Sequence, residues 1–444
     1  MDFGDCSEAE LTHSQTHRWI NRTDRSVARP SCSPRVLPEA SPSILNPSLL
    51  RQKGTIWLDT ARPDVDTGNS RGFLFAKPYE MLTARTAAEI DPLLKSMQEE
   101  TARGNWVAGL LPYEVGYVLE PTVFAPPEDG PLGWFGVYEK PIEVSSGDAE
   151  TLLADSPRSR IASAQFGIDR DDYTEQIGRI RAHIAAGDVY QVNFTAPFRF
   201  QLEGDSVGLY AAIRQRQRAP YGAFLNLGDK QVLSFSPELF FRMQPAPEKA
   251  GRWKITTRPM KGTTHRSTSS AEDDHLADAL FNDEKNRAEN LMIVDLLRND
   301  LSRVSEAGSV RVPELFTIER YETVTQMTST VEGTLKQGVG LSDALRALFP
   351  CGSVTGAPKI RAMQLIRELE GRTRGVYCGA IGFAGPNGEA AFSVPIRTVV
   401  LSEGEDRTTV GELGVGSGVV WDSEAGAEYD ECLLKARFLT EMAA

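Results

Sequence analysis

The feature that most constrains the fold of this chain is a series of short apolar runs, each bounded by Gly or Pro. They begin after Thr55, at residues 56–58 and 73–75, and they recur as far as the glycine-rich segment 414–420. Runs of this length and boundary predict β-strands. The predicted strands and helices occur in groups rather than in strict alternation, which favours an α+β fold with two packed, largely antiparallel sheets flanked by helices.

The order of these signals divides the chain into three parts. Residues 1–54 are rich in Ser, Pro, Arg and Thr and lack a hydrophobic period, so we predict a disordered extension, or alternatively an over-extended start of the reading frame. Residues 55–150 are predicted to form an N-terminal portion of the fold. Residues 143–163 are predicted to be a connecting loop, and residues 164–444 are predicted to form the catalytic core.

Helices are predicted from apolar spacing and from end signals. Asp169 suits the N-cap of a helix whose apolar residues recur at spacings of four, three and four, and Gly187 is a stop signal. A longer helical run covers residues 272–304. Further helices are predicted to open at Pro358 and near Ser423.

Charge and residue usage exclude several classes of function. The chain has 61 acidic and 48 basic residues, and its formal net charge of −13 disfavours binding to nucleic acid and anionic membranes. No stretch approaches the roughly 20 apolar residues that span a bilayer, and the N-terminus lacks the apolar region of a secretory signal. We therefore expect a cytoplasmic protein.

Cysteine and histidine spacing argues against two further kinds of site. The five cysteines show no CxxC motif or paired spacing, and the five histidines include no HExxH motif. The sequence thus predicts neither a disulfide framework nor a transition metal bound by histidine.

One candidate site lies on the predicted last helix. Glu428, Glu431 and Lys435 stand at positions i, i+3 and i+7 and therefore share one stripe of that helix. The preceding glycine-rich strand allows backbone N–H groups to approach a ligand. Two carboxylates and an ammonium suit a hard cation with an anionic ligand, whereas the alternative is a solvated face with a helical ion pair.

Further candidates come from two other segments. Glu289 precedes an apolar patch of the long helical run and offers an oxygen ligand of the kind that Mg²⁺ prefers, or is a surface carboxylate. Lys261 is followed by Gly262 and Thr263 after a proline, which marks a turn. It is either a surface lysine or a nucleophile, and the second role requires a neutral amine.

Two more windows suggest contacts to an anion. The segment 350–366 is a glycine-bearing loop that runs into a helix, so it predicts either an anion site or plain helix capping. Arg397 alternates with apolar residues on a predicted strand. Its guanidinium suits a bidentate contact to a carboxylate, or alternatively it is a charge on an edge strand.

Taken together and in this order, these sequence segments resemble the chorismate-binding enzyme family. The resemblance covers residues 169–438 and extends more weakly back to Phe73. The matching blocks are "GDVYQVNFT", "SFSPELFF", "RPMKGT", "NRAENLMIVDLLRNDLSRV", "GSVTGAPKIRAMQLI", "GAIGF", "FSVPIRT" and "GVGSGVVWDSEAGAEYDECLLKAR".

The resemblance implies a cleft in a two-sheet sandwich in which Mg²⁺ bridges the ring carboxylate of chorismate to protein carboxylates. Glu289 and Glu431 match the metal ligands, and Glu428 lies beside them. The residues that match substrate contacts are Gly262, Thr263, Tyr377, Arg397, Gly416, Ser417, Gly418 and Lys435.

The resemblance also implies which reaction is catalysed. Lys261 stands where relatives that aminate C4 of chorismate carry a lysine, and Gln191 stands where relatives that add water carry a lysine base. The implied mechanism is a covalent adduct of Lys261 at ring carbon C2, with Glu238 as the acid that helps the 4-hydroxyl leave. Ammonia then gives 4-amino-4-deoxychorismate, a step on the way to p-aminobenzoate and folate.

Two departures and two alternatives accompany this interpretation. Gln326 replaces a histidine that assists pyruvate loss in anthranilate-forming relatives, and Asn286 replaces an acidic residue near the metal. No glutamine-hydrolysing machinery is visible, so the resemblance implies a separate glutaminase subunit as ammonia source. The alternatives are the reaction of anthranilate synthase component I and a non-catalytic chorismate-binding subunit.

Overall fold

A computed structural model describes residues 45–62, 71–121, 132–154, 156–246, 251–321, 324–404 and 406–442. The predicted disorder of residues 1–44 lies outside this described part. The described fold begins at Leu45 rather than at Thr55, because the short 3₁₀ helix η1 (Pro47–Arg51) buries Leu50 completely.

Among the described residues, one sheet has ten strands, and every pairing in it is antiparallel. The path of hydrogen-bonded neighbours is β16 (Gly356–Ala357), β8 (Gln191–Glu203), β20 (Thr409–Val419), β19 (Thr398–Glu403), β10 (Lys230–Ser236), β9 (Tyr221–Asn226), β1 (Ile56–Asp59), β2 (Gly72–Phe75) and β6 (Ile142–Val144), with β7 (Arg160–Phe166) paired to β8. The longest ladder joins β8 to β20, which places Gly418 opposite Asn193.

The described part contains a second ten-stranded antiparallel sheet. Its path is β13 (Met260–His265), β15 (Val324–Thr334), β12 (Trp253–Arg258), β11 (Leu239–Pro245), β18 (Ala390–Ser393), β17 (Ala380–Ala384), β4 (Trp106–Leu111), β5 (Gly133–Tyr138) and β3 (Glu80–Ala84), with β14 (Arg311–Arg320) paired to β15. The predicted α+β fold with two largely antiparallel sheets is therefore confirmed.

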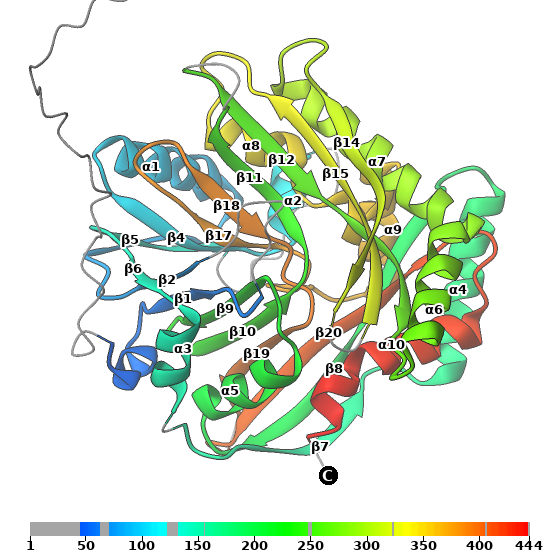
Figure 1. The fold of residues 1–444 in the computed structure, drawn as a ribbon, viewed down its shortest axis with the longest axis horizontal. Coiled ribbons are helices and arrows are strands. Elements are labelled where there is room, and N and C mark those ends of the chain that lie inside the picture. The colour runs from blue at the N-terminus through cyan, green and yellow to red at the C-terminus, as the bar shows by residue number, and fades with distance from the viewer. Residues whose placement is uncertain are drawn as a thin grey trace, which may run out of the picture. The chain divides into compact units, whose positions relative to one another are not determined.

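Helices flank both sheets (Figure 1). They are α1 (Ile90–Ala102), α2 (Val115–Leu119), α3 (Ser146–Leu153), α4 (Arg170–Ala185), α5 (Ser206–Arg216), α6 (Ser270–Asn282), α7 (Glu284–Val304), α8 (Leu341–Leu348), α9 (Lys359–Glu370) and α10 (Ala425–Thr440), with 3₁₀ turns η2 (Ala87–Glu89) and η3 (Gly352–Val354). Helix α10 packs on β20 and on α4, whereas α7 packs on β13 and β15. Within the described residues, no helix is long and apolar enough to cross a membrane.

Two local predictions were wrong, and capping explains both. The segment 143–163 is not a loop, since it contains the end of β6, helix α3 and the start of β7. Ser145 and Asp148 form a reciprocal capping box, and α3 buries Leu152. The helical run 272–304 is two helices, because Asp283 caps α7 by accepting a hydrogen bond from the backbone N–H of Asn286.

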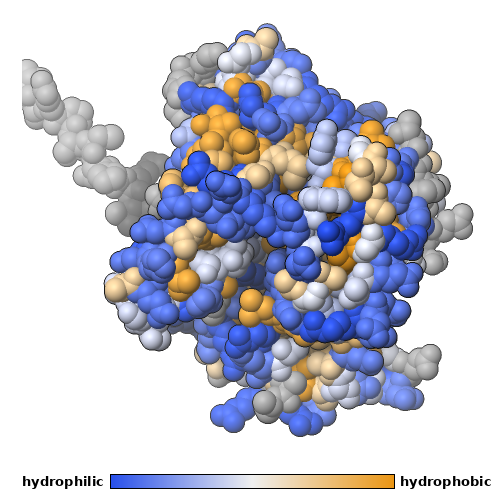
Figure 2. All heavy atoms as spheres, turned by 90° about the vertical axis from the view of Figure 1, so that its right-hand side faces the viewer, coloured by the Kyte–Doolittle hydropathy of each residue, from blue (hydrophilic) through white to orange (hydrophobic). Residues whose placement is uncertain are grey.

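Other local predictions are confirmed. Helix α4 begins after Asp169, whose side chain accepts a bond from the N–H of Asp172, and it ends before Gly187 at φ +80°. Helix α10 begins at Ala425, close to the predicted start near Ser423. The side of the molecule formed by α4, α6 and α10 is mainly hydrophilic, with separate hydrophobic patches (Figure 2).

Candidate active site

Three glycines open one face of strand β20. Side chains alternate between the two faces of a strand, so Gly414, Gly416 and Gly418 share a face. A Cβ atom on Gly414 would lie 2.3 Å from the ring of Tyr377, and one on Gly418 would lie 2.8 Å from Nζ of Lys261. The glycines therefore form a strip of bare backbone about 13 Å long, which Tyr377 and Lys261 approach closely at its two ends.

The neighbouring residue Ser417 faces the other way. Its hydroxyl lies 3.1 Å from the hydroxyl of Tyr173 on α4. Of the predicted contacts on β20, Gly416 and Gly418 thus lie on the open face, and Ser417 can reach that face only through its backbone.

A kink in strand β13 places Lys261. The pairing of β13 with β15 shifts register between Met260 and Thr263, and Gly262 adopts φ +85°, which favours glycine. A Cβ on Gly262 would also meet the side chain of Asn286 at 3.1 Å. The local sequence Lys-Gly-Thr therefore bends the strand so that Lys261 lies against Gly418.

Three carboxylates converge near this lysine from two helices. Glu289 is a half-buried residue of α7, and Glu428 and Glu431 belong to α10. Burial raises the pKa of Glu289, the nearby Lys261 and Lys285 oppose that rise, and the charges of Glu428 and Glu431 add to it. Lys261 thus lies within electrostatic reach of both Glu289 and Glu431.

The stripe on α10 serves in part as a helical ion pair. Lys435 donates to Glu431 at 2.6 Å and to the backbone carbonyl of Gly416 at 2.9 Å. Burial raises the pKa of Glu431, but the stronger combined influence of Lys435 and two other lysines lowers it overall. Glu428 is buried and lies 4.0 Å from the ammonium of Lys285.

The carboxylates fit a magnesium ion by their chemistry. In the described part of the chain, no group of three or more His, Cys, Asp or Glu side chains is closed around a common point. Glu289 and Glu431 nevertheless supply carboxylate oxygens within electrostatic reach of each other, and Mg²⁺ commonly takes one or two carboxylates and completes its shell with water and substrate oxygens.

Glu238 lies between β10 and β11 and is 2% exposed. Its Oε1 accepts a 2.5 Å hydrogen bond from Oγ of Ser353. Burial raises the pKa of Glu238 to about 7, while the bond from Ser353, the charge of Lys261 and the backbone N–H of Met260 lower it. A carboxyl group with this pKa is suited to act as a general acid near neutral pH.

Polar side chains of β8 lie beside the glycine strip of β20. Gln191 and Asn193 alternate with apolar residues and share the face of Gly418, because Asn193 is its cross-strand partner. The amide nitrogen of Gln191 lies 2.3 Å from a Cβ placed on Gly418. Asn193 was missed by the sequence analysis, although the polar–apolar alternation of "YQVNFT" is a signal that could have identified it.

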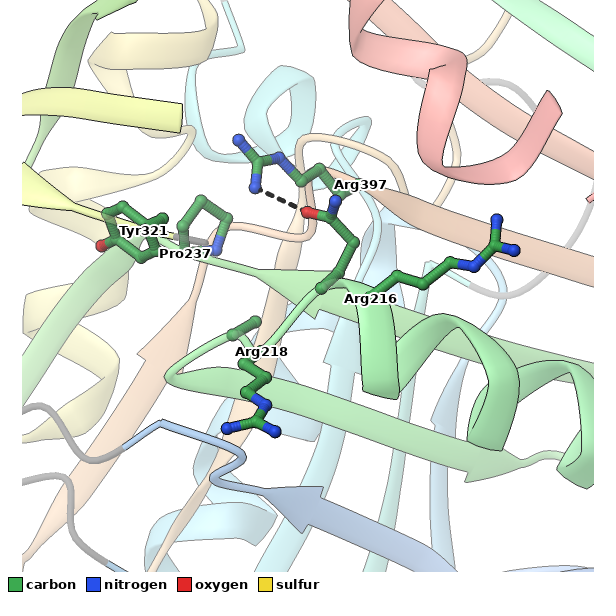
Figure 3. A pocket seen from close by; sticks show the side chains of 7 residues that line it. Arg216, Arg218, Pro237, Tyr321 and Arg397 are labelled. Carbon is green, nitrogen blue, oxygen red and sulfur yellow. Dashed lines mark hydrogen bonds between the residues drawn. The ribbon is translucent and has the colours of Figure 1, made fainter. Parts of the chain in front are cut away.

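Tyr377 and Arg397 are two further predicted substrate contacts, and they lie in different surroundings. Tyr377 borders the strip at Gly414, whereas Arg397 adopts φ +50° just before β19. Arg397 donates a 3.1 Å hydrogen bond to Gln217 and lines a small pocket with Pro237 (Figure 3). Burial lowers the pKa of Arg397 from its ordinary value.

Arg397 is therefore neither on a strand, as predicted, nor an edge-strand charge. In the described residues, its pocket shares no lining residue with the Lys261 cluster. Figure 3 also shows that Arg216 and Arg218 point away from Arg397.

The predicted anion-binding loop before α9 is closed. Residues 351–357 are buried, and Gly356 pairs with Val192 of β8. Ser353 faces Glu238 and Thr355 bonds to the carbonyl of Cys351. This segment places Ser353 beside the carboxyl group of Glu238 and does not form an open anion site.

The glycine strip of β20, Lys261, Lys435, the buried acid Glu238 and the nearby carboxylates together form the candidate site. A family model described as chorismate binding enzyme matches residues 55–441, and the chain belongs to this family.

Similar proteins carry two kinds of name. The chain is 42% identical to aminodeoxychorismate synthase component 1 of Klebsiella aerogenes over 315 residues, which are 67% of each protein. It is 42% identical to the protein of that name from Salmonella typhimurium over 61% of this chain and 58% of the relative. It is 39% identical to anthranilate synthase component 1 of Methanothermobacter thermautotrophicus over 65% of this chain and 60% of that relative.

Solved structures agree on the fold. Anthranilate synthase component I from Streptococcus pneumoniae superposes with a TM-score of 0.71 at 27% identity, over 84% of this chain and 92% of that one. An isochorismate synthase from Bacillus anthracis superposes with a TM-score of 0.70 at 18% identity, over 89% and 98% of the two chains, which shows likeness of fold alone.

Proposed function

We propose that this protein aminates chorismate at C4 and so acts as an aminodeoxychorismate synthase component 1, forming 4-amino-4-deoxychorismate for p-aminobenzoate and folate synthesis. The observation that carries the proposal is the position of Lys261. Its ammonium group lies against Gly418, within electrostatic reach of Glu238, Glu289 and Glu431. Relatives with this name at 42% identity support the same reaction.

Two glutamines favour amination at C4 over related reactions. Gln191 borders the strip beside Lys261, and its neutral amide cannot act as a base that activates water. Gln326 donates to Oγ1 of Thr263 at 3.4 Å and likewise cannot act as a general base. A product that keeps its enolpyruvyl group is consistent with this lack of a base.

The proposed reaction uses Lys261 as nucleophile and Glu238 as acid. The neutral amine of Lys261 attacks C2, both ring double bonds shift, and the C4–oxygen bond breaks as Glu238 gives its proton to the departing hydroxyl, which leaves as water. Ammonia then attacks C4, both double bonds shift back, the C2–nitrogen bond to Lys261 breaks, and the new ammonium group on C4 returns a proton to Glu238. The amine thus returns to its starting state.

Other residues bind rather than react. Glu289 and Glu431, with Glu428 beside them, would hold Mg²⁺, which when bound would neutralise the carboxylates and help to stabilise charge on the departing oxygen. Tyr377, Arg397, Gly416, Gly418 and Lys435 are proposed to contact the substrate carboxylates, together with the backbone of Ser417 and the loop residues Gly262 and Thr263.

A second chain is part of the proposal. The term component 1 in the relatives' name is consistent with a partner component. We propose a glutaminase subunit as the source of ammonia, with free ammonium as a poorer substitute in its absence.

The test is the product formed from chorismate, Mg²⁺ and ammonium. Mass spectrometry should show the non-aromatic amine that retains its enolpyruvyl group. Fluorescent anthranilate would instead support the reaction of the anthranilate synthase relatives. Tight chorismate binding without turnover, with or without the glutaminase, would support a non-catalytic binding subunit.

A further inference from the structure

The turn before α9 contributes a hydroxyl to the proposed acid. Ser353 is 5% exposed, and its Oγ donates to Oε1 of Glu238 at 2.5 Å. The Sγ of Cys351 lies 3.1 Å from the same hydroxyl oxygen. Burial, together with the charge of Glu238, raises the pKa of Cys351 to about 12, so this cysteine remains a thiol at neutral pH.

The number of hydrogens on each group indicates which group donates in each of these contacts. A serine hydroxyl carries one hydrogen, and that hydrogen is used on Glu238. Cys351 must then be the donor in the sulfur–oxygen contact, so the order is Cys351 S–H to Ser353 O–H to Glu238 Oε1. With Oε1 occupied as an acceptor, the proton of a neutral Glu238 resides on Oε2.

We propose that Ser353 is a positioning residue that holds the Glu238 carboxyl so that its acidic proton sits on Oε2, the oxygen that would deliver the proton to the substrate. The inference rests on the proposed function, because it assigns Glu238 the role of acid. The charged or titratable groups that face Glu238 are Lys261 from β13 and Cys351 from the same turn as Ser353.

The expected change in pH dependence has a definite sign. A neutral Glu238 is required, so the rate per free ammonia should fall as pH rises above the pKa of Glu238, which is about 7. The bond from Ser353 stabilises the carboxylate and lowers that pKa. Its loss in Ser353→Ala should therefore move the fall in rate to higher pH by about one unit, a tenfold change in the ionisation constant.

The experiment compares three variants with the wild type. We expect Ser353→Ala to move the basic limb of kcat/KM upward and to lower its plateau roughly tenfold, because the proton is no longer confined to Oε2. Ser353→Thr keeps the hydroxyl and should restore both values. Thr355→Val loosens the same turn by removing bonds to Cys351 and Tyr113, so it should lower Tm without moving the limb.

An infrared titration without chorismate separates this inference from the proposed reaction. The carboxyl band of Glu238, assigned by its absence in Glu238→Gln, should change frequency and titrate about one unit higher in Ser353→Ala. An unchanged band and midpoint would overturn the inference even if amination is confirmed. An upward limb shift of equal size in Thr355→Val would overturn it as well. A shifted band in a protein that forms no amine would retain the positioning of Glu238 and reject the reaction.

Discussion

Two clusters of charged residues, one around Arg374 and one around Lys261, lie close together in this fold. They differ in whether their polar groups have hydrogen-bond partners within the protein. Arg374 is 4% exposed and donates to Glu370 at 2.6 Å, to the carbonyl of Asn193 at 2.6 Å and to the carbonyl of Val354 at 2.8 Å. Glu114 accepts bonds from the backbone N–H groups of Arg374 and its neighbour Gly375. This cluster satisfies its polar groups internally.

The Lys261 cluster leaves polar groups without protein partners. Among the described residues, the side chains of Lys261 and Glu289 make no hydrogen bond or ion pair. In that part of the chain, both amide atoms of Gln191 and Oε1 of Gln326 are buried and also lack partners. Buried polar groups are normally satisfied, so we expect a bound ligand to supply partners to these three amide atoms.

The largest expected effect is on activity. Lys261→Ala should lower the rate of C4 amination by roughly 10⁴-fold, about 5.5 kcal/mol, because the covalent step is lost. Stability should be nearly unchanged, since no protein partner is abandoned. The measurement is amine formation from ammonium at saturating chorismate, with the exposed residue substitution Lys230→Ala as control. Amination by Lys261→Ala at the wild-type rate would remove the covalent step.

The Arg374 cluster should show the reverse pattern. Arg374→Met removes the buried guanidinium that pairs with Glu370 at 2.6 Å, and breaking a buried ion pair costs about 3–5 kcal/mol. Denaturant unfolding should show this loss in the free energy of unfolding. Folded protein at low temperature should still aminate chorismate within about threefold of wild type. A stable variant with little activity would show that the two clusters are not separate in function.

The carboxylates that are proposed to bind metal should show an intermediate effect. Glu289→Gln should lower kcat/KM roughly 100-fold at fixed Mg²⁺ and raise the Mg²⁺ concentration needed for half-maximal rate, since a charged ligand is lost. Chelation of Mg²⁺ should abolish wild-type activity. Because Asn286 replaces an acidic residue, the wild-type requirement should already exceed that of relatives. A micromolar requirement would contradict this expectation.

Local signals explain why much of the fold was predictable. Asp169 and Gly187 bound helix α4 through their own backbone preferences, and short apolar runs matched antiparallel strands. Where a cap lay inside a continuous helical pattern, as at Asp283, the break was missed. The polar stretch around Ser145 hid a helix whose stability depends on the burial of Leu152 by the rest of the fold.

The site was predictable only in part, because its geometry depends on long-range pairing. The spacing of Glu428, Glu431 and Lys435 showed one stripe, but nothing local placed Lys261 beside Gly418. Only the family resemblance brought Lys261 together with Glu289. Ser353 was hidden in a loop assigned to anion binding or capping, since its contact with Glu238 joins two distant segments. Whether the amide of Gln191 has a hydrogen-bond partner likewise depends on the folded structure and cannot be seen in the sequence.

The smallest effect concerns two buried amide side chains, one without hydrogen-bond partners and one with them. Gln191 has no partner for either amide atom, whereas Asn226 donates to the carbonyl of Leu50 at 3.2 Å and accepts from Gly228 at 3.1 Å. Gln191→Leu removes an unsatisfied buried amide and should stabilise the free protein by about 1 kcal/mol. Asn226→Leu removes a satisfied one and should destabilise it by about 1–3 kcal/mol.

Urea unfolding without chorismate measures both variants, and product formation shows the functional consequence. Gln191→Leu should be more stable but less active, because the amide that borders Lys261 is held for a ligand rather than for the fold. Loss of stability in Gln191→Leu equal to that in Asn226→Leu would mean that Gln191 is satisfied in solution. One cluster would bond its polar groups within the protein, and the other would bond them to a ligand. That contrast would then no longer hold at position 191.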